Sequence, residues 1–224
     1  VTAPNTSTDR TITLPDATGT LLNSDGSGAS LTSLPNQKVN SNLIINGDFA
    51  VSQRGSYTSA TSVADGSYYL DRWAVAFGGV SATIQDMGYS AKVVATSTAT
   101  GSLRHRQKFE EMAFLSGKTV TISCQMKSND ANSRINMYAD GWQSTTATHT
   151  GGGAWETISI TLTIPSGVTT ELSAHFGIDG VSSADVTVTS GDYCEIKEVK
   201  MELGSTATDF EHRSYGEELA LCQR

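Results

Sequence analysis

The sequence predicts an all-β protein, folded as an antiparallel β-sandwich. Only 17% of its 224 residues are charged and 7% are aromatic, while threonine, serine, glycine and alanine are abundant. This composition favours strands and turns over long helices. Short apolar runs are separated by turn residues at fairly regular spacing. Several of these runs alternate apolar with polar residues, as strands with one buried face do.

The first part of the chain, residues 1–40, is predicted to be an extended stalk segment. It is rich in serine, threonine, asparagine and aspartate and has one β-like patch, Arg10–Leu14. Its apolar residues are isolated, so one copy cannot offset the entropy of its own ordering. We expect it to be disordered or to pair with copies of itself in other chains, which would make it an oligomerisation segment. The apolar residues are Ile12, Leu14, Leu21, Leu22, Leu31 and Leu34.

Residues 41–210 are predicted to form the sandwich, and residues 211–224 a short C-terminal helical tail. The expected helical segments are Glu110–Leu115 and Tyr215–Cys222. The expected strands are Asn42–Ile45, Asp71–Phe77, Ala82–Asp86, Ala91–Thr96, Leu103–Phe109, Thr119–Ser128, Arg134–Ala139, Glu156–Ile164, Glu171–Ile178 and Cys194–Leu203.

Three of these strands have alternating apolar rows that we expect to face the core. The third row skips one position, which predicts a β-bulge. The rows are Val120, Ile122, Cys124 and Met126; Ile158, Ile160, Leu162 and Ile164; and Ile196, Val199, Met201 and Leu203.

Charge and cysteine content exclude several functional classes. The net charge of −8 and the pI near 4.9 disfavour nucleic acid as a partner, because binding to the phosphate backbone depends on clustered Lys and Arg. Cys124, Cys194 and Cys222 have neither the number nor the spacing of a disulfide framework or a zinc site. No apolar run approaches the ~20 residues needed to span a bilayer, so membrane insertion is not expected.

Catalytic motifs are absent from the sequence. The four histidines are scattered, and no GxSxG, HExxH or Walker-type pattern surrounds a serine, histidine or lysine. The run Gly151–Gly153 lacks the Lys-Ser/Thr pair of a phosphate loop, so we interpret it as an ordinary loop. We therefore expect a protein that is not an enzyme and that has no cofactor. A depolymerase, which needs two suitably separated carboxylates, is the less favoured alternative.

Exposed aromatic side chains are the remaining candidates for a ligand-binding site. A Trp or Tyr ring presents an apolar face to a sugar while its polar edge forms hydrogen bonds. Trp142 lies in a polar turn after a predicted strand, and we expect it to bind a ligand together with Tyr138, Gln143 and Trp155. A ring folded back over the end of the sandwich remains an open alternative for Trp142. By contrast, Trp73 alternates with apolar neighbours and is expected in the core.

Several stretches resemble a C-terminal module of phage and prophage tail fibres. Asn42–Gly55 and Glu198–Arg224 resemble its two ends, and the region 2–21 resembles the stalk linkers that precede fibre tips. Three internal segments look like landmarks of the same family, so the resemblance extends from residue 42 to residue 224. They are Tyr69–Trp73, Leu103–Glu111 and Leu115–Ser123.

This resemblance implies a fold, an assembly and a partner. Family members are similar to jelly-roll carbohydrate-binding modules, which implies a jelly-roll tip that binds a host receptor, a surface polysaccharide or lipopolysaccharide. The family also implies a homotrimer in the virion tail, in contact with other tail proteins. Comparable modules often hold a structural Ca²⁺, for which Asp48, Glu198 or Glu202 could supply oxygens. A structural spacer or adaptor without receptor binding is the main alternative.

Overall fold

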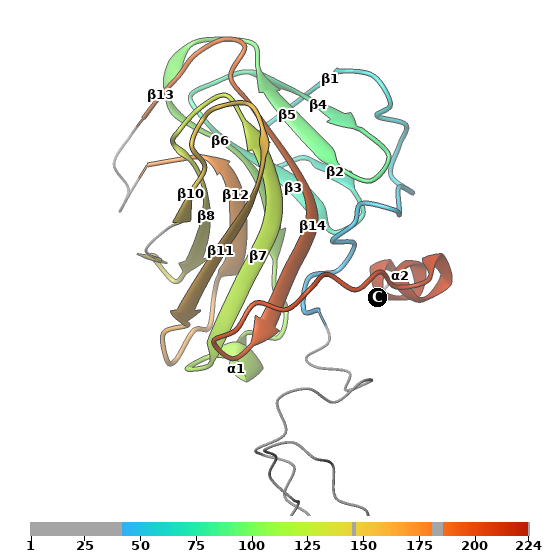
Figure 1. Cartoon of the computed structure of the whole chain (residues 1–224), viewed down its shortest axis with the longest axis vertical. Coiled ribbons are helices and arrows are strands. Elements are labelled where there is room, and N and C mark those ends of the chain that lie inside the picture. The colour runs from blue at the N-terminus through green and yellow to red at the C-terminus, as the bar shows by residue number, and fades with distance from the viewer. Residues whose placement is uncertain (1–41, 145–146, 181–185, 224) are drawn as a thin grey trace, which may run out of the picture. The chain divides into compact units, whose positions relative to one another are not determined.

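The computed structural model describes residues 42–144, 147–180 and 186–223. The stalk predicted for residues 1–40 therefore lies outside the described residues. Two antiparallel sheets face each other and form a jelly-roll β-sandwich (Figure 1). The predicted all-β sandwich is confirmed. None of the described helices is long and apolar enough to cross a membrane.

Among the described residues, one sheet has six strands and the other has eight, and every strand pair is antiparallel. The order of the first sheet is β1 (Thr61–Val63), β4 (Ala82–Asp86), β5 (Ala91–Ala95), β14 (Tyr193–Leu203), β7 (Thr119–Ser128) and β11 (Trp155–Thr163). The order of the second sheet is β10 (Ala147–Thr148), β8 (Ser133–Ala139), β12 (Leu172–Ile178), β6 (Ala99–Lys108), β3 (Trp73–Gly78) and β2 (Tyr68–Leu70). In addition, β13 (Val186–Val188) pairs with β6, and β9 (Trp142–Gln143) pairs with β8.

Apolar side chains between the two sheets form the core. All the side chains of the three predicted rows are buried except Leu203, which is partly exposed. Trp73 is also buried as predicted, and its ring lies 5.0 Å from that of Phe49 and 5.7 Å from that of Phe176. The predicted bulge in β14 is present, because the register with β7 shifts between Lys197 and Lys200. The bulge keeps Val199 in the core.

The strand predicted at Asn42–Ile45 is wrong. This segment has no regular secondary structure, because side chains satisfy much of its backbone hydrogen bonding. The Gln107 amide accepts from the N–H of Ile45 at 2.9 Å and donates to its carbonyl at 2.8 Å. The Asn42 side chain accepts from the N–H groups of Ile44 and Met201 at 2.9 and 3.0 Å. Apolar content indicated burial correctly, but it could not reveal these amide partners.

The N-terminal and C-terminal segments of the sandwich domain meet near the bulge in β14. The Val199 N–H donates to the Gly47 carbonyl at 2.8 Å, and the Trp73 indole N–H donates to the Asn46 carbonyl at 2.8 Å. Helix α2 (Tyr215–Cys222) matches its predicted range. Its buried Glu218 carboxylate accepts a hydrogen bond from the Asn46 N–H and forms an ion pair with Arg213 at 3.1 Å. The short helix α1 (Met112–Leu115) lies between β6 and β7.

Candidate functional site

Strand β6 places three cationic side chains on the face of the eight-stranded sheet that points away from the core. Successive strand residues point to opposite faces, so burial of Leu103, His105 and Gln107 turns Arg104, Arg106 and Lys108 outward. We call the outward residues of β2, β3, β6, β8 and β12 the cationic face.

The neighbours of this cationic row are small or neutral. On β3, Ala74 and Ala76 pair with Arg106 and Arg104, and on β12, His175 and Gly177 pair with the same two arginines. Small neighbours leave the guanidinium groups room to lie along the sheet.

Two tyrosines flank the row. Tyr138 on β8 and Tyr68 on β2 each lie two strands from β6, roughly 10 Å away at the usual strand spacing. The cationic face therefore combines a charged centre with an aromatic ring on each side.

Asp179, at the end of β12, holds the β8 side of the face in place. Its Oδ2 atom accepts hydrogen bonds from Arg104 at 2.9 Å, from Asn136 at 2.6 Å and from the Tyr138 hydroxyl at 2.6 Å. Burial and the Asp179 carboxylate raise the pKa of Tyr138, so its hydroxyl stays protonated and donates to Asp179. The Tyr138 ring also lies 4.5 Å from the His175 ring. These contacts fix the aromatic ring before any ligand arrives.

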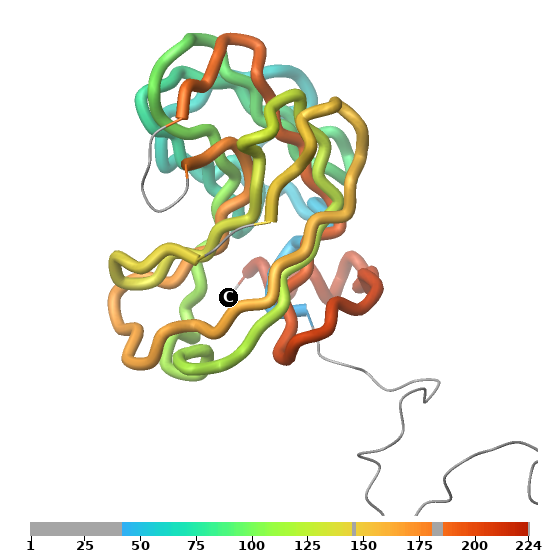
Figure 2. Tube along the Cα trace, turned by 60° about the vertical axis from the view of Figure 1, so that its left-hand side comes forward, coloured from blue at the N-terminus to red at the C-terminus, as the bar shows by residue number. Residues whose placement is uncertain are grey.

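The turn between β8 and β9 fixes the same edge. Asp140 and Gly141 have φ of 42° and 84°, as the two-residue hairpin turn requires. The Asp140 carboxylate accepts from the N–H groups of Thr169 at 2.8 Å, Thr170 at 3.0 Å and Glu171 at 2.7 Å, which lowers its pKa. Those bonds tie the hairpin to the loop before β12, and the two lie side by side in Figure 2.

Five buried side-chain polar atoms of the described residues have no hydrogen-bond partner, and all five lie on the cationic face. They are Nε of Arg104, Nε of Arg106, one terminal nitrogen of Arg134, Oδ1 of Asn136 and Nδ1 of His175. Burial and the positive charges of Arg104, Arg106 and Lys108 lower the pKa of His175 well below its usual value, so the ring is neutral. Unpartnered buried polar atoms are rare in proteins, and here they supply both donors and acceptors.

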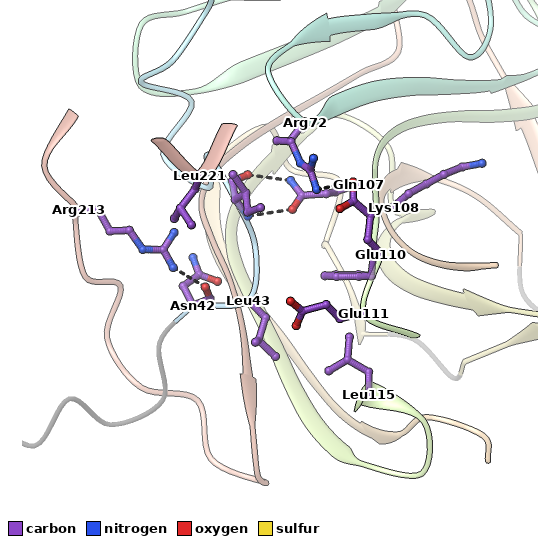
Figure 3. Close-up of a pocket in the computed structure, with 12 residues that line it drawn as sticks. Asn42, Leu43, Arg72, Gln107, Lys108, Glu110, Glu111, Leu115, Arg213 and Leu221 are labelled. Carbon is purple, nitrogen blue, oxygen red and sulfur yellow. Dashed lines mark hydrogen bonds and ion pairs between the residues drawn. The ribbon is translucent and has the colours of Figure 1, made fainter. Parts of the chain in front are cut away.

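At the β2 edge the face continues into a groove. The Arg54 guanidinium lies 5.1 Å from the centroid of the Tyr68 ring, which is 43% exposed. A cavity of about 550 Å³ lies beside them, lined also by Arg72, Lys108 and Glu110. Arg72 pairs with Glu110 at 3.0 Å. An adjoining pocket of about 310 Å³ is also lined by Arg72, Lys108 and Glu110. It extends toward Leu43, Leu115 and Leu221 (Figure 3).

The four residues predicted to bind a ligand fall in three places. Tyr138 and Gln143 pair across the β8–β9 hairpin and point to the cationic face, where Gln143 donates to the Gly180 carbonyl at 3.1 Å. Trp142 lies on strand β9, opposite Ala139, and packs against the core. Trp155 lies on the outer face of the six-stranded sheet, where Lys197 is 4.6 Å from its ring. The cationic face also contains residues that the sequence analysis did not single out, namely Arg104, Arg106, Arg134, Asn136, His175 and Asp179.

Trp142→Ala is expected to lower the free energy of unfolding by about 2 kcal/mol, because a half-buried ring packed on the core is lost. The matched control is Trp155→Ala, which removes a ring that is 37% exposed and is expected to cost less than about 1 kcal/mol. Urea unfolding of both variants measures the difference. Equal losses would argue against the packing of Trp142 on the core.

The carboxylates suggested for Ca²⁺ are not gathered into one site. Glu202 accepts from the Thr208 N–H and hydroxyl, both at 2.8 Å, and lies 3.6 Å from Lys200. Asp48 lies 3.3 Å from His212. Among the described residues, no group of three or more His, Cys, Asp or Glu side chains could hold a metal ion.

Comparisons with known proteins give distant structural likenesses. A CBM4 carbohydrate-binding module is 18% identical, with 71% of this chain and 98% of that chain covered and a TM-score of 0.42. A family 22 carbohydrate-binding module of Clostridium thermocellum Xyn10B is 18% identical, covers 65% and 99% of the two chains, and has a TM-score of 0.42. The enzymatically active domain of bacteriophage CBA120 tailspike protein 4 is 12% identical, covers 73% and 21%, and has a TM-score of 0.43. The sequence matched no protein-family model and no curated protein.

Proposed function

We propose that this protein is the receptor-binding part of a phage tail fibre and that its cationic face binds a glycan of the host surface without cleaving it. The observation that carries the proposal is the gathering of all five unpartnered buried polar atoms on this one face. A sugar hydroxyl both donates and accepts, so neighbouring hydroxyls can bond to the accessible N–H groups of Arg104 and Arg106, whose side chains are partly exposed. The tyrosines on both sides of β6 offer rings to the apolar faces of the sugar.

The contacts of Asp179 support binding without cleavage. Three donors converge on one of its oxygens, so this carboxylate holds neighbouring side chains in place. Hydrolysis of a glycosidic bond needs a free acid and a second carboxylate across the bond. The tail-fibre setting, the homotrimer and the position in the virion tail are proposed from the ordered landmarks between residues 42 and 224 and from the stalk-like residues 1–40.

Tyr68→Ala is expected to weaken binding of the full chain to host cells about fivefold, because an exposed ring at the edge of the face is lost, while stability stays within about 0.5 kcal/mol. The matched control is Tyr215→Ala, which removes a ring that is 58% exposed at the start of α2. Cell adsorption, with and without stripped surface polysaccharide, measures the effect. Equal adsorption of both variants, or adsorption unchanged by stripping, would contradict the proposal and favour a structural spacer.

A further inference from the structure

The cationic face has a positive charge on an acidic protein. The chain carries a net charge of −8. On the outward positions of β3, β6, β8 and β12, however, there are four cations and no carboxylate, and the carboxylates of Asp179 and Glu171 lie just beyond the two ends of β12. Arg54 and Arg72 lie at the edge of the same face, and Arg213 lines the adjoining pocket together with Arg72 and Lys108. The four cations are Arg104, Arg106, Lys108 and Arg134.

Part of this positive charge is not neutralised by the described residues. Asp179 pairs with Arg104 at 2.9 Å. No described carboxylate forms an ion pair with Arg106 or Lys108, whereas Arg134 interacts with the nearby carboxylates of Asp179 and Asp130. Outward residues two apart on a strand are separated by roughly 7 Å, so the three cations of β6 repel one another.

The burial of Arg106 and Arg134 favours an anionic ligand, and not bulk solvent, as the partner that neutralises the remaining positive charge of the face. Arg134 is only 5% exposed and one of its terminal nitrogens has no partner, and Nε of Arg106 is likewise buried and unpartnered. Buried, incompletely bonded guanidinium groups are costly. An oxyanion at the partly exposed Arg106 offsets this cost, because two of its oxygens accept parallel hydrogen bonds from one guanidinium group.

We propose that the glycan bound by the cationic face is acidic and that Arg106 pairs with an oxyanion of the sugar. This inference rests on the proposed function and specifies its ligand class. The oxyanion is a carboxylate or a phosphate group, since a guanidinium group recognises both in the same way. Arg106 is the central contact because its strand neighbours are Ala74 and the neutral His175, which leave the guanidinium group free of competing carboxylates.

The test is binding of the full chain to a glycan array that contains matched neutral, carboxylate-bearing and phosphate-bearing glycans. We expect the acidic member of a matched set to bind at least tenfold more tightly than the neutral one. Its binding should weaken as salt is raised, because salt screens exposed charges. Arg106→Gln should abolish most of this preference. The control Lys118→Gln removes the same charge from an exposed position after α1 and should leave the preference unchanged.

The outcomes separate this inference from the proposed function. Preference for carboxylate or for phosphate glycans supports the inference and identifies the source of the oxyanion. Equal binding of neutral and acidic glycans overturns the inference and leaves glycan binding intact. Equal losses in Arg106→Gln and Lys118→Gln also overturn it, because they show attraction to net charge alone. Binding to no glycan overturns the proposed function together with the inference.

Discussion

Gly47→Ala is expected to lower the free energy of unfolding by about 3 kcal/mol, the upper part of the usual range for overpacking. A Cβ atom at this position would lie 2.2 Å from the backbone carbonyl oxygen of Val199. Backbone cannot move aside as a flexible side chain can, so the bulge of β14 or the first turn of the sandwich must shift. The same shift would strain the 2.8 Å hydrogen bond from Val199 to Gly47.

Gly216→Ala is the matched control for this substitution. Gly216 lies in α2, is exposed, and has nothing within 4 Å of its added Cβ. An alanine there should raise stability by about 0.5 to 1 kcal/mol, because glycine is a poor helix former. Equilibrium urea unfolding gives both values. A loss below about 1 kcal/mol in Gly47→Ala would mean that the bulge adapts easily and that the contact is not tight.

The sequence was informative wherever a strand is long and has one buried face. The predicted ranges of β4 and β7 agree with the structure, because alternation over five to ten residues leaves one choice of buried face. Strands such as β9 and β10 have two residues each and are too short for any such pattern. Asn42–Ile45 was misassigned because its hydrogen-bond partners are the side chains of Gln107 and Asn42 itself, which no local pattern reveals.

The candidate site was only partly predictable, and Trp142 shows why. An Asp-Gly pair favours a two-residue hairpin turn, in which Trp142 pairs with Ala139 and so points to the same core side. That step could have been taken from the sequence alone. The neighbours of Arg106 could not be predicted from the sequence, since β6 lies between β3 and β12, and the paired residues Ala74 and His175 are far away along the chain. A cationic row in a strand becomes a candidate site only when its neutral neighbours are known.

Asp179→Ala is expected to lower the free energy of unfolding by about 3 kcal/mol, because removing one partner of a largely buried ion pair leaves the other charge without compensation. The side chains of Arg104 and Asp179 are only 16% and 10% exposed. Asn136 and Tyr138 would lose the same acceptor. The matched control Glu211→Ala removes an acidic side chain from an exposed position and should change stability by less than about 0.5 kcal/mol.

The same substitution should also weaken glycan binding, although it makes the face more positive. If charge alone governed binding, loss of Asp179 would strengthen the attraction of an acidic glycan. We instead expect at least tenfold weaker binding at a temperature where circular dichroism shows the variant to be folded. The reason is that Arg104 and the Tyr138 ring lose the contacts that hold them in place, and a mobile site must pay the entropy of ordering when the ligand binds. Unchanged or tighter binding by the folded variant would show that the Asp179 contacts do not organise the site.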